Sequence, residues 1–418
     1  MPKRDIKKYL YYALPAMPLA LLGLPLYVYL PTFYAQDIGL SVFGVGIVLL
    51  VARFFDMLFD PVIGYWSDRY FPRKVLMGTG AILLLFGFYF LTHPTEGASY
   101  IWLFVFSIFV YFGWSLLSIP YFALGSDLGE SYEQNTRYAS FRELFNISGV
   151  LLALLLPYLY GVSQNPSESL LLINNLIFLL LPVMLISFFK QVQVQRVASS
   201  LNSLGEITRQ FFSELKKSKY LFSAFFLNSF ANALPATLFL LFVELVIGAK
   251  EQSGLLLLLY FFSGILALVF WNYLARKTSK KTAWIFSMLN AIVFFSFVPF
   301  LGEGDLVYFM LITVFSGMSL GADMVLPASM QADVAQNSSK SSSEFGGTLF
   351  GFFAMLTKLS LAFGVGVSFA ILGIFDFEPT APNESSLFVL TLLYGALPVC
   401  LKLLAIIILS NYKEHNQL

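Results

Sequence analysis

The sequence predicts an all-α membrane protein with twelve transmembrane helices arranged as two six-helix bundles. Of its 418 residues, 58% are hydrophobic and only 12% are charged, which leaves too little polar surface to cover a soluble protein. Apolar runs of about 20 residues or more repeat along the chain, and this is the length that crosses a bilayer. Each run must be helical, because backbone groups in hydrocarbon need partners within their own segment.

The apolar runs form two sets of six, separated by one long polar segment. The first set lies at residues 10–36, 42–66, 74–93, 98–127, 141–162 and 170–190. The second set lies at residues 219–247, 253–276, 282–301, 306–329, 346–374 and 386–411. We therefore expect an N-terminal bundle at 1–190, a linker at 191–218 and a C-terminal bundle at 219–418.

The linker has an apolar pattern of its own. Leu204, Ile207, Phe211, Phe212 and Leu215 recur at near-helical spacing among basic residues. This pattern predicts an amphipathic helix on the membrane surface. A flexible linker is the alternative interpretation, and the sequence leaves it open.

Lysines and arginines indicate the topology. With the N-terminus placed in the cytoplasm, only Lys250 falls in a loop on the opposite side. The cytoplasmic loops then hold the basic residues of the linker and Lys3, Arg4, Lys7, Lys8, Arg69, Arg73, Lys74, Arg137, Arg276, Lys277, Lys280, Lys281, Lys340 and Lys413. This asymmetry follows the positive-inside rule and predicts that both termini are cytoplasmic. The short basic loops at 64–74 and 272–281 occupy equivalent positions in the two halves, which indicates an internal repeat.

The composition excludes several classes of protein. The formal net charge of +1 gives no field that favours nucleic acid, and the single cysteine, Cys400, allows no intramolecular disulfide. Two histidines are too few for a zinc site of the usual kind. The chain has no P-loop and no cysteine or histidine cluster for a metal, so we expect neither an enzyme nor an ATP-driven pump, and no cofactor. The expected partners are the lipid bilayer and a small-molecule substrate, and we expect a monomer.

The second apolar run carries Arg53, Asp56 and Asp60, spaced so that all three lie on one face of a helix. Charges at this depth cost at least about 2.5–3.5 kcal/mol each and usually mark a functional site. Two carboxylates one turn apart can bind a hard cation such as sodium, or can share a proton. Lys358 is the candidate counter-charge from the other half. A buried network that only locks helices together is the alternative interpretation.

Several motifs resemble a known transporter family. The loop at 64–74 looks like the G-x-x-x-D-R signature, with a basic pair after it, of the major facilitator superfamily. Residues 52–61 resemble the A-R-x-x-D-x-x-x-D-P element of the glycoside–pentoside–hexuronide:cation symporters, the melibiose permease family. Residues 119–124, followed by Thr136, Arg137 and Arg142, are similar to a further segment of that family, and Lys358 stands where it carries an intramembrane lysine.

This resemblance implies the major facilitator fold, alternating access and a cation site on the second helix. Asp56 and Asp60 would bind the coupling ion, as metal ligands if that ion is sodium, and Ser115 falls where the family has a hydroxyl ligand on helix 4. Sodium-coupled lysophospholipid carriers look related to the same family.

The sequence also departs from the family. The two acids that hold a galactoside in the sugar permease align near Ala20 and Ser118, and the first apolar run has no acid between Ile6 and Gln36. We therefore do not expect a melibiose-type galactoside as substrate. Phe59 stands where the family often has an asparagine, which supplies an additional oxygen ligand for the cation. Coupling to sodium and coupling to protons therefore both remain open.

The remaining candidates belong to a substrate cavity or to a cytoplasmic gate. Prolines and aromatic residues crowd the first run, which predicts a kinked helix. The candidates for the cavity are Arg53, Tyr27, Trp114, Ser118, Tyr121, Phe122, Arg142 and Asp323. The candidates for the gate are Asp68, Arg69, Arg73 and Asp127, and Arg142 fits either group.

These observations predict a cation-coupled secondary transporter of a small solute in the plasma membrane, which in a bacterium is the inner membrane. Efflux or flipping of a lysolipid, a drug or another amphipathic substrate on the same scaffold is the alternative. A receptor without transport activity would not need Asp56, Asp60 and Lys358 within the membrane.

Overall fold

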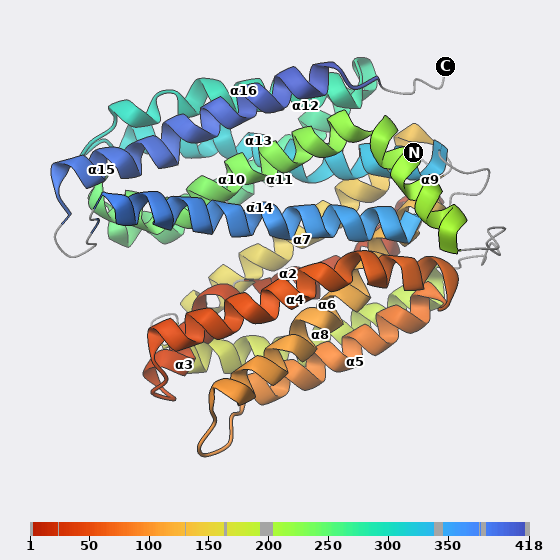
Figure 1. Ribbon diagram of the computed structural model, residues 1–418, viewed down its shortest axis with the longest axis horizontal. Coiled ribbons are helices and arrows are strands. Elements are labelled where there is room, and N and C mark those ends of the chain that lie inside the picture. Colours follow the sequence, from red (N-terminus) through yellow and green to blue (C-terminus); the bar gives the residue numbers. More distant parts are fainter. Residues whose placement is uncertain are drawn as a thin grey trace. The chain divides into compact units, whose positions relative to one another are not determined.

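The protein is helical throughout the part of the chain that the structure describes (Figure 1). This computed structural model describes residues 3–23, 25–129, 131–162, 165–192, 204–337, 346–375, 377 and 382–413. Ten segments within these ranges are long and apolar enough to cross a membrane. Two further segments, the broken first helix and the charge-bearing α4, complete the twelve that the sequence predicts.

The first apolar run is broken into short pieces. It comprises α1 (Lys3–Ala13), α2 (Ala16–Leu21), a π-helical turn at Pro25–Tyr29 and α3 (Leu30–Gln36). Pro15 directly precedes α2 and Pro25 begins the π-helical turn. Proline has no N–H to donate and its ring crowds the preceding turn, so the helix breaks at these points. The predicted kink in the first helix is confirmed.

The other helices are long, and several begin at a side-chain cap. Those of the first half are α4 (Val42–Arg69), α5 (Arg73–Thr92), α6 (Tyr100–Leu128), α7 (Tyr132–Leu159) and α8 (Pro166–Gln191). Ser41, Ser131 and Asn165 each accept a hydrogen bond from a backbone N–H in the first turn of the helix that follows. Such caps satisfy donors that have no partner inside the helix.

The second half repeats this arrangement after the linker. Its helices are α9 (Leu204–Lys217), α10 (Lys219–Leu245), α11 (Ser253–Lys277), α12 (Lys280–Phe295), α13 (Leu306–Asn337), α14 (Gly346–Ile374), α15 (Glu384–Thr391) and α16 (Leu397–Ser410). A π-helical turn at Leu392–Ala396 joins α15 to α16. α9 occupies part of the expected linker, of which residues 193–203 lie outside the described part, and its position on the membrane surface stays a prediction.

The chain forms two compact units. The first comprises residues 1–211 with 331–355, and the second comprises residues 212–330 with 356–418. The end of α13 and the start of α14 therefore belong to the first unit, although the sequence places them in the C-terminal half. Each unit has its own apolar core.

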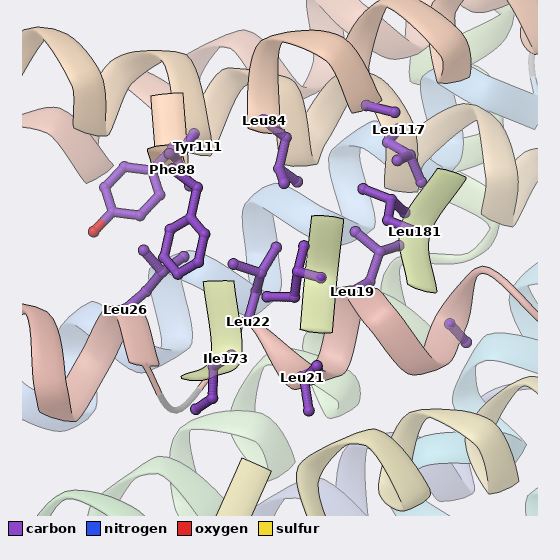
Figure 2. Close-up of a cluster of buried hydrophobic side chains, with 14 of the residues drawn as sticks. Leu19, Leu21, Leu22, Leu26, Leu84, Phe88, Tyr111, Leu117, Ile173 and Leu181 are labelled. Carbon is purple, nitrogen blue, oxygen red and sulfur yellow. The ribbon is translucent and has the colours of Figure 1, made fainter. Parts of the chain in front are cut away.

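The core of the first unit surrounds α2. Figure 2 shows Leu19, Leu22 and Leu26 among side chains from α5, α6 and α8, including Phe88 and Leu181. These side chains are almost fully buried. In the second unit a separate core packs Phe242 of α10 against Tyr394, with the two rings stacked at 4.1 Å.

Glycines allow a close helix contact in the first unit, between α5 and α6. A methyl group added at Gly80 would lie 2.7 Å from the carbonyl oxygen of Gly113, and one at Gly113 would lie 2.6 Å from the backbone nitrogen of Leu84. The two helices can approach this closely only because neither glycine carries a Cβ. This contact fixes the position of α6, which carries Ser115.

Lysines at equivalent positions in the two halves bind the end of a later helix. Lys74, the second residue of α5, donates to the carbonyl oxygens of Phe189 and Val192 at the end of α8. Lys281, the second residue of α12, donates to the carbonyl oxygens of Ser410 and Tyr412, each at 2.7 Å, at the end of α16. Both lysines complement the negative end of a helix dipole, and the repeat seen in the sequence is thus repeated in the contacts.

Candidate functional site

The acids of α4 lie on a buried face of an otherwise apolar helix. Asp56 is 5% exposed and Asp60 is fully buried. The neighbouring residues Phe55, Leu58 and Phe59 are exposed, which is the pattern of a helix with one polar, inward face. Because a buried carboxylate needs partners to remain charged, the surroundings of this face determine what it can bind.

Ser115 of α6 lies directly beside Asp56. Its hydroxyl donates a hydrogen bond of 2.8 Å to Asp56 Oδ1, and both side chains are buried. A hydroxyl oxygen and two carboxylates are hard ligands of the kind that sodium prefers. The structure therefore brings together three of the residues that the sequence assigns to ion coupling.

Arg53 supplies the positive charge closest to these acids along α4. Its guanidinium carbon lies 5.3 Å from the centre of the Tyr111 ring, and its charge interacts with those of Asp56 and Asp60. Arginine can stack on an aromatic ring while keeping its donors free for carboxylates. The cluster therefore combines two acidic side chains and one basic side chain on α4 itself.

Phe59 stands at the position where the melibiose permease family often has an asparagine. Its ring is exposed and packs edge-on against Phe112 at 5.7 Å. Phe59 therefore does not share the burial of the two acids. The cation ligands that the described residues offer are the carboxylates and Ser115, and no group of three or more histidine, cysteine, aspartate or glutamate side chains forms a metal site among them.

Lys358 lies in the middle of α14, within the second unit, and is half-buried. Asp56 and Asp60 belong to the first unit. The pairing of Lys358 with these acids stays a prediction.

Three of the four residues assigned to the gate, Asp68, Arg73 and Asp127, form a connected group in the first unit. Asp68, near the end of α4, accepts hydrogen bonds of 2.7 Å from the backbone nitrogens of Gly347 and Thr348. It thereby caps the first turn of α14 and places a negative charge at the positive end of that helix. Arg73 donates to Asp68 at 3.2 Å and also binds Asp127 at the end of α6.

Arg69 completes the predicted gate group and is half-buried in the last turn of α4. Four segments of the first unit thus meet at three charged side chains: the ends of α4 and α6 and the starts of α5 and α14. Their role as a gate stays a prediction.

Arg142 of α7 is buried in a network that the sequence did not specify. Its Nε donates to Glu143 Oε1 at 2.9 Å, and its guanidinium lies over the ring of Phe122 at 4.4 Å. Asn146 donates to the other oxygen of Glu143, also at 2.9 Å. The sequence analysis did not identify Asn146, which follows Arg142 at a spacing of four residues and therefore lies on the same face of α7.

The aromatic candidates differ in their surroundings. Tyr121 is fully buried, donates to the backbone oxygen of Tyr12 at 2.8 Å and packs against Phe188 in the core of the first unit. Ser118 is also buried, whereas Trp114 and Phe122 are half-buried. The side chain of Tyr27 lies outside the described part, and a cavity role for any of these residues stays a prediction.

Asp323 of α13 lies in a buried polar network of the second unit. It pairs with Lys402 of α16 at 3.3 Å and accepts hydrogen bonds of 2.8 Å from Asn232 and Trp284. Lys402 was missed, although a single lysine within the apolar run 386–411 is a recognisable signal.

Comparison with known proteins agrees with this fold. The sequence profile of the MFS/sugar transport proteins matches residues 11–414. The chain belongs to this family. The fold expectation and the expectation of a transporter rather than an enzyme are therefore confirmed, and the protein is a multi-pass integral membrane transporter of the major facilitator type.

Two relatives indicate the range of functions around this MFS transporter. The sodium-dependent lysophosphatidylcholine symporter 1-A of Danio rerio is 22% identical over 96% of this chain and 84% of its own length. The uncharacterized symporter YnaJ of Bacillus subtilis (strain 168) is 24% identical over 92% of this chain and 86% of its own length.

Solved structures share the fold at low identity. A bacterial homologue of the iron transporter ferroportin, in an outward-facing state, superimposes with a TM-score of 0.72 at 14% identity, covering 97% of this chain and 99% of that one. The transporter FucP in its outward conformation superimposes with a TM-score of 0.69 at 14% identity, covering 96% of this chain and 98% of that one. The expected resemblance is thus confirmed at the level of the superfamily.

Proposed function

We propose that this MFS transporter is a sodium-coupled symporter of an amphipathic, lysophospholipid-like substrate. The observation that carries the proposal is the buried group of Asp56, Asp60 and Ser115, in which a serine hydroxyl meets an aspartate at 2.8 Å on a membrane helix. The geometry supports ion binding, and the substrate class is supported by the relatives.

Sodium is the proposed coupling ion. Its ligands would be the carboxylates of Asp56 and Asp60 together with the hydroxyl of Ser115, with Arg53 balancing one of the two negative charges. The sodium-dependent relatives favour this ion over a proton. Lys358 would take the place of the ion when the site is empty, because an ammonium can neutralise the same carboxylates.

The substrate is proposed from two independent lines of support. Ala20 and Ser118 are both buried and neither is acidic, so the positions that align with sugar-binding acids offer no bidentate acceptors for hydroxyls. Relatives named as lysophosphatidylcholine symporters cover most of this chain. A sphingosine-1-phosphate transporter of Xenopus tropicalis, 29% identical over 46% of this chain and 38% of its own length, is also named for a lysolipid.

The cycle would use the two remaining groups of candidates. Asp68, Arg69, Arg73 and Asp127 would form the cytoplasmic gate, because release of Asp68 from Gly347 and Thr348 frees the start of α14. The substrate cavity would be formed by Arg53, Tyr27, Trp114, Ser118, Tyr121, Phe122, Arg142 and Asp323. We place the transporter in the plasma membrane as a monomer with both termini in the cytoplasm, as the basic loops favour.

Uptake into proteoliposomes tests this function. The purified chain is reconstituted, and entry of labelled lysophosphatidylcholine is followed under an inward sodium gradient, an inward proton gradient or neither. We expect sodium alone to accelerate uptake. Asp56→Asn and Asp60→Asn should reduce sodium-driven uptake to the level of protein-free vesicles, because each removes one of the charges that bind the ion.

Glu133→Gln is the matched control, because Glu133 is an exposed carboxylate paired with Arg137 on the surface of α7. It should leave uptake unchanged. Equal rates with and without sodium in the wild type would contradict sodium coupling. A sodium-driven flux of another solute class, with no lysolipid uptake, would support sodium as the coupling ion and contradict lysolipid as the substrate. Faster exit than entry of lysolipid would indicate efflux.

A further inference from the structure

The second unit contains a buried charge pair that the proposed coupling site does not use. Asp323 and Lys402 have side chains only 7% and 6% exposed, and their charged atoms lie 3.3 Å apart. Isolated charges are strongly disfavoured in such surroundings, so each requires the other. The pair joins α13 to α16 within the second unit.

Every polar atom of the pair has a defined partner. Trp284 Nε1 donates to Asp323 Oδ1 and Asn232 Nδ2 donates to Asp323 Oδ2, both at 2.8 Å. The ammonium of Lys402 donates to Asn228 Oδ1 at 2.7 Å and to Asp323 Oδ2 at 3.3 Å. The carboxylate therefore accepts from three donors.

The ammonium lies between two oxygen ligands that come from different helices. Asn228 is on α10 and Asp323 is on α13, whereas Lys402 reaches them from α16. Tyr260 of α11 is the further titratable group within electrostatic range of Asp323. An amide oxygen and a carboxylate oxygen around one positive charge form the kind of ligand set that small monovalent cations also use.

We propose that the ammonium of Lys402 is a tethered cation that occupies a monovalent-cation site formed by Asp323 and Asn228. The site takes a small alkali cation such as sodium when the ammonium is removed. The second unit thereby keeps a permanent cation, whether or not the first unit exchanges an ion at Asp56 and Asp60. This proposal concerns residues of the second unit alone and does not depend on the substrate.

The physical argument is one of charge balance. Removing the ammonium leaves the Asp323 carboxylate without its counter-charge, while Trp284 and Asn232 still donate to it. A small cation restores neutrality at the same oxygens and can fill the space that a shortened side chain leaves. A neutral side chain as long as lysine fills this space without restoring the charge.

Thermal unfolding of the purified full-length chain in detergent tests the proposal. All measurements are made in an Asp56→Asn, Asp60→Asn background, so that ions bound at α4 do not contribute. Lys402→Ala is compared in sodium chloride and in N-methylglucamine chloride at equal ionic strength. We expect its melting temperature to be several degrees higher in sodium and to rise with sodium concentration, as for any ligand of the native state. The parent background should show no such difference.

Two matched variants locate the effect. Lys402→Met fills the space without a charge and should be destabilised equally in both salts. Adding Asp323→Asn to Lys402→Ala removes the charge that binds the ion and should abolish the sodium shift.

Equal melting temperatures of Lys402→Ala in the two salts would overturn the proposal, and so would a sodium shift that survives Asp323→Asn. Failure of both Lys402→Ala and Lys402→Ser to fold in sodium buffer would also contradict it, because the ion should replace the lost charge. The outcome is independent of the proposed transport function, since neither the assay nor the background uses the coupling site.

Discussion

A single serine hydroxyl links α6 to the acids of α4. Ser115 donates to Asp56 at 2.8 Å in a buried setting, while Asp60 lies one turn further along α4. A hydrogen bond to a charged group contributes about 1.5–3 kcal/mol, and its loss leaves a buried charge less well solvated. At the scale of the residue, the affinity for the coupling ion should therefore depend on this one oxygen.

Ser115→Ala should weaken the binding of the coupling ion by about tenfold or more, which corresponds to a loss of about 1.4 kcal/mol in binding free energy. The measurement is the sodium concentration that gives half-maximal uptake in proteoliposomes. Ser107→Ala, which changes another buried serine of α6, is the control and should leave this concentration unchanged. An unchanged sodium requirement in Ser115→Ala would show that the hydroxyl positions Asp56 without binding the ion.

The sequence identified the charged residues better than their partners. Asp56 and Asp60 stand out because carboxylates are rare in apolar runs, and Ser115 was found through its resemblance to a family ligand. Lys402 and its partner Asn228 were missed, because neither belongs to a motif and their contact joins residues far apart in the chain. Hydrogen bonds between distant helices depend on the rotation of each helix, which periodicity alone does not determine.

Helix contacts determine where these residues lie. At the scale of the element, α5 and α6 are held together at Gly80 and Gly113, where an added Cβ would lie within 3.0 Å of backbone atoms. Backbone atoms cannot move aside as a flexible side chain can. The position of Ser115 beside α4 thus depends on the absence of side chains on the opposite face of α6.

Gly80→Ala should destabilise the protein by about 1–3 kcal/mol, because overpacking forces the two helices apart. Thermal unfolding in detergent measures this as a fall of several degrees in the melting temperature. Gly78→Ala, two residues earlier on α5, is the control, because its Cβ would meet only the far edge of Phe189 at 4.0 Å. Equal melting temperatures for the two variants would contradict the close packing at Gly80.

The lysine contacts at the ends of α8 and α16 allow a test of the internal repeat. Lys74→Gln and Lys281→Gln should each destabilise the chain by about 1–2 kcal/mol, because each removes a charge and a donor from a helix C-terminus. Similar falls in melting temperature are expected for the two variants. Lys8→Gln, in the middle of α1 and exposed, is the control. A fall in melting temperature for only one of the two variants would argue against equivalent roles of Lys74 and Lys281.

At the scale of the whole molecule, composition and periodicity predicted the helical fold and the number of spans. The prolines of the first helix predicted its break. α4 is absent from the ten strongly apolar spans because it carries several charged residues. The assignment of residues 331–355 to the first unit could not be predicted, because it depends on contacts such as the hydrogen bonds from Gly347 to Asp68 and from Asn135 to Asp333. Such contacts depend on three-dimensional packing and leave no periodic signal.

Coupling is a property of the whole transporter, since ion and substrate must move together. In the proposed symport cycle, the binding of sodium and the movement of lysolipid are thermodynamically linked, so a gradient of either should drive the other. The most direct measurement is therefore the reverse of the uptake assay. Radioactive sodium entry into proteoliposomes is followed while an inward gradient of lysophosphatidylcholine is imposed.

We expect the lysolipid gradient to accelerate sodium entry in the wild type and to have no effect in Asp60→Asn, whose ion site lacks one carboxylate. Glu133→Gln should behave as the wild type. Sodium entry that stays at the level of protein-free vesicles, while labelled lysolipid still enters, would contradict sodium coupling at Asp56 and Asp60.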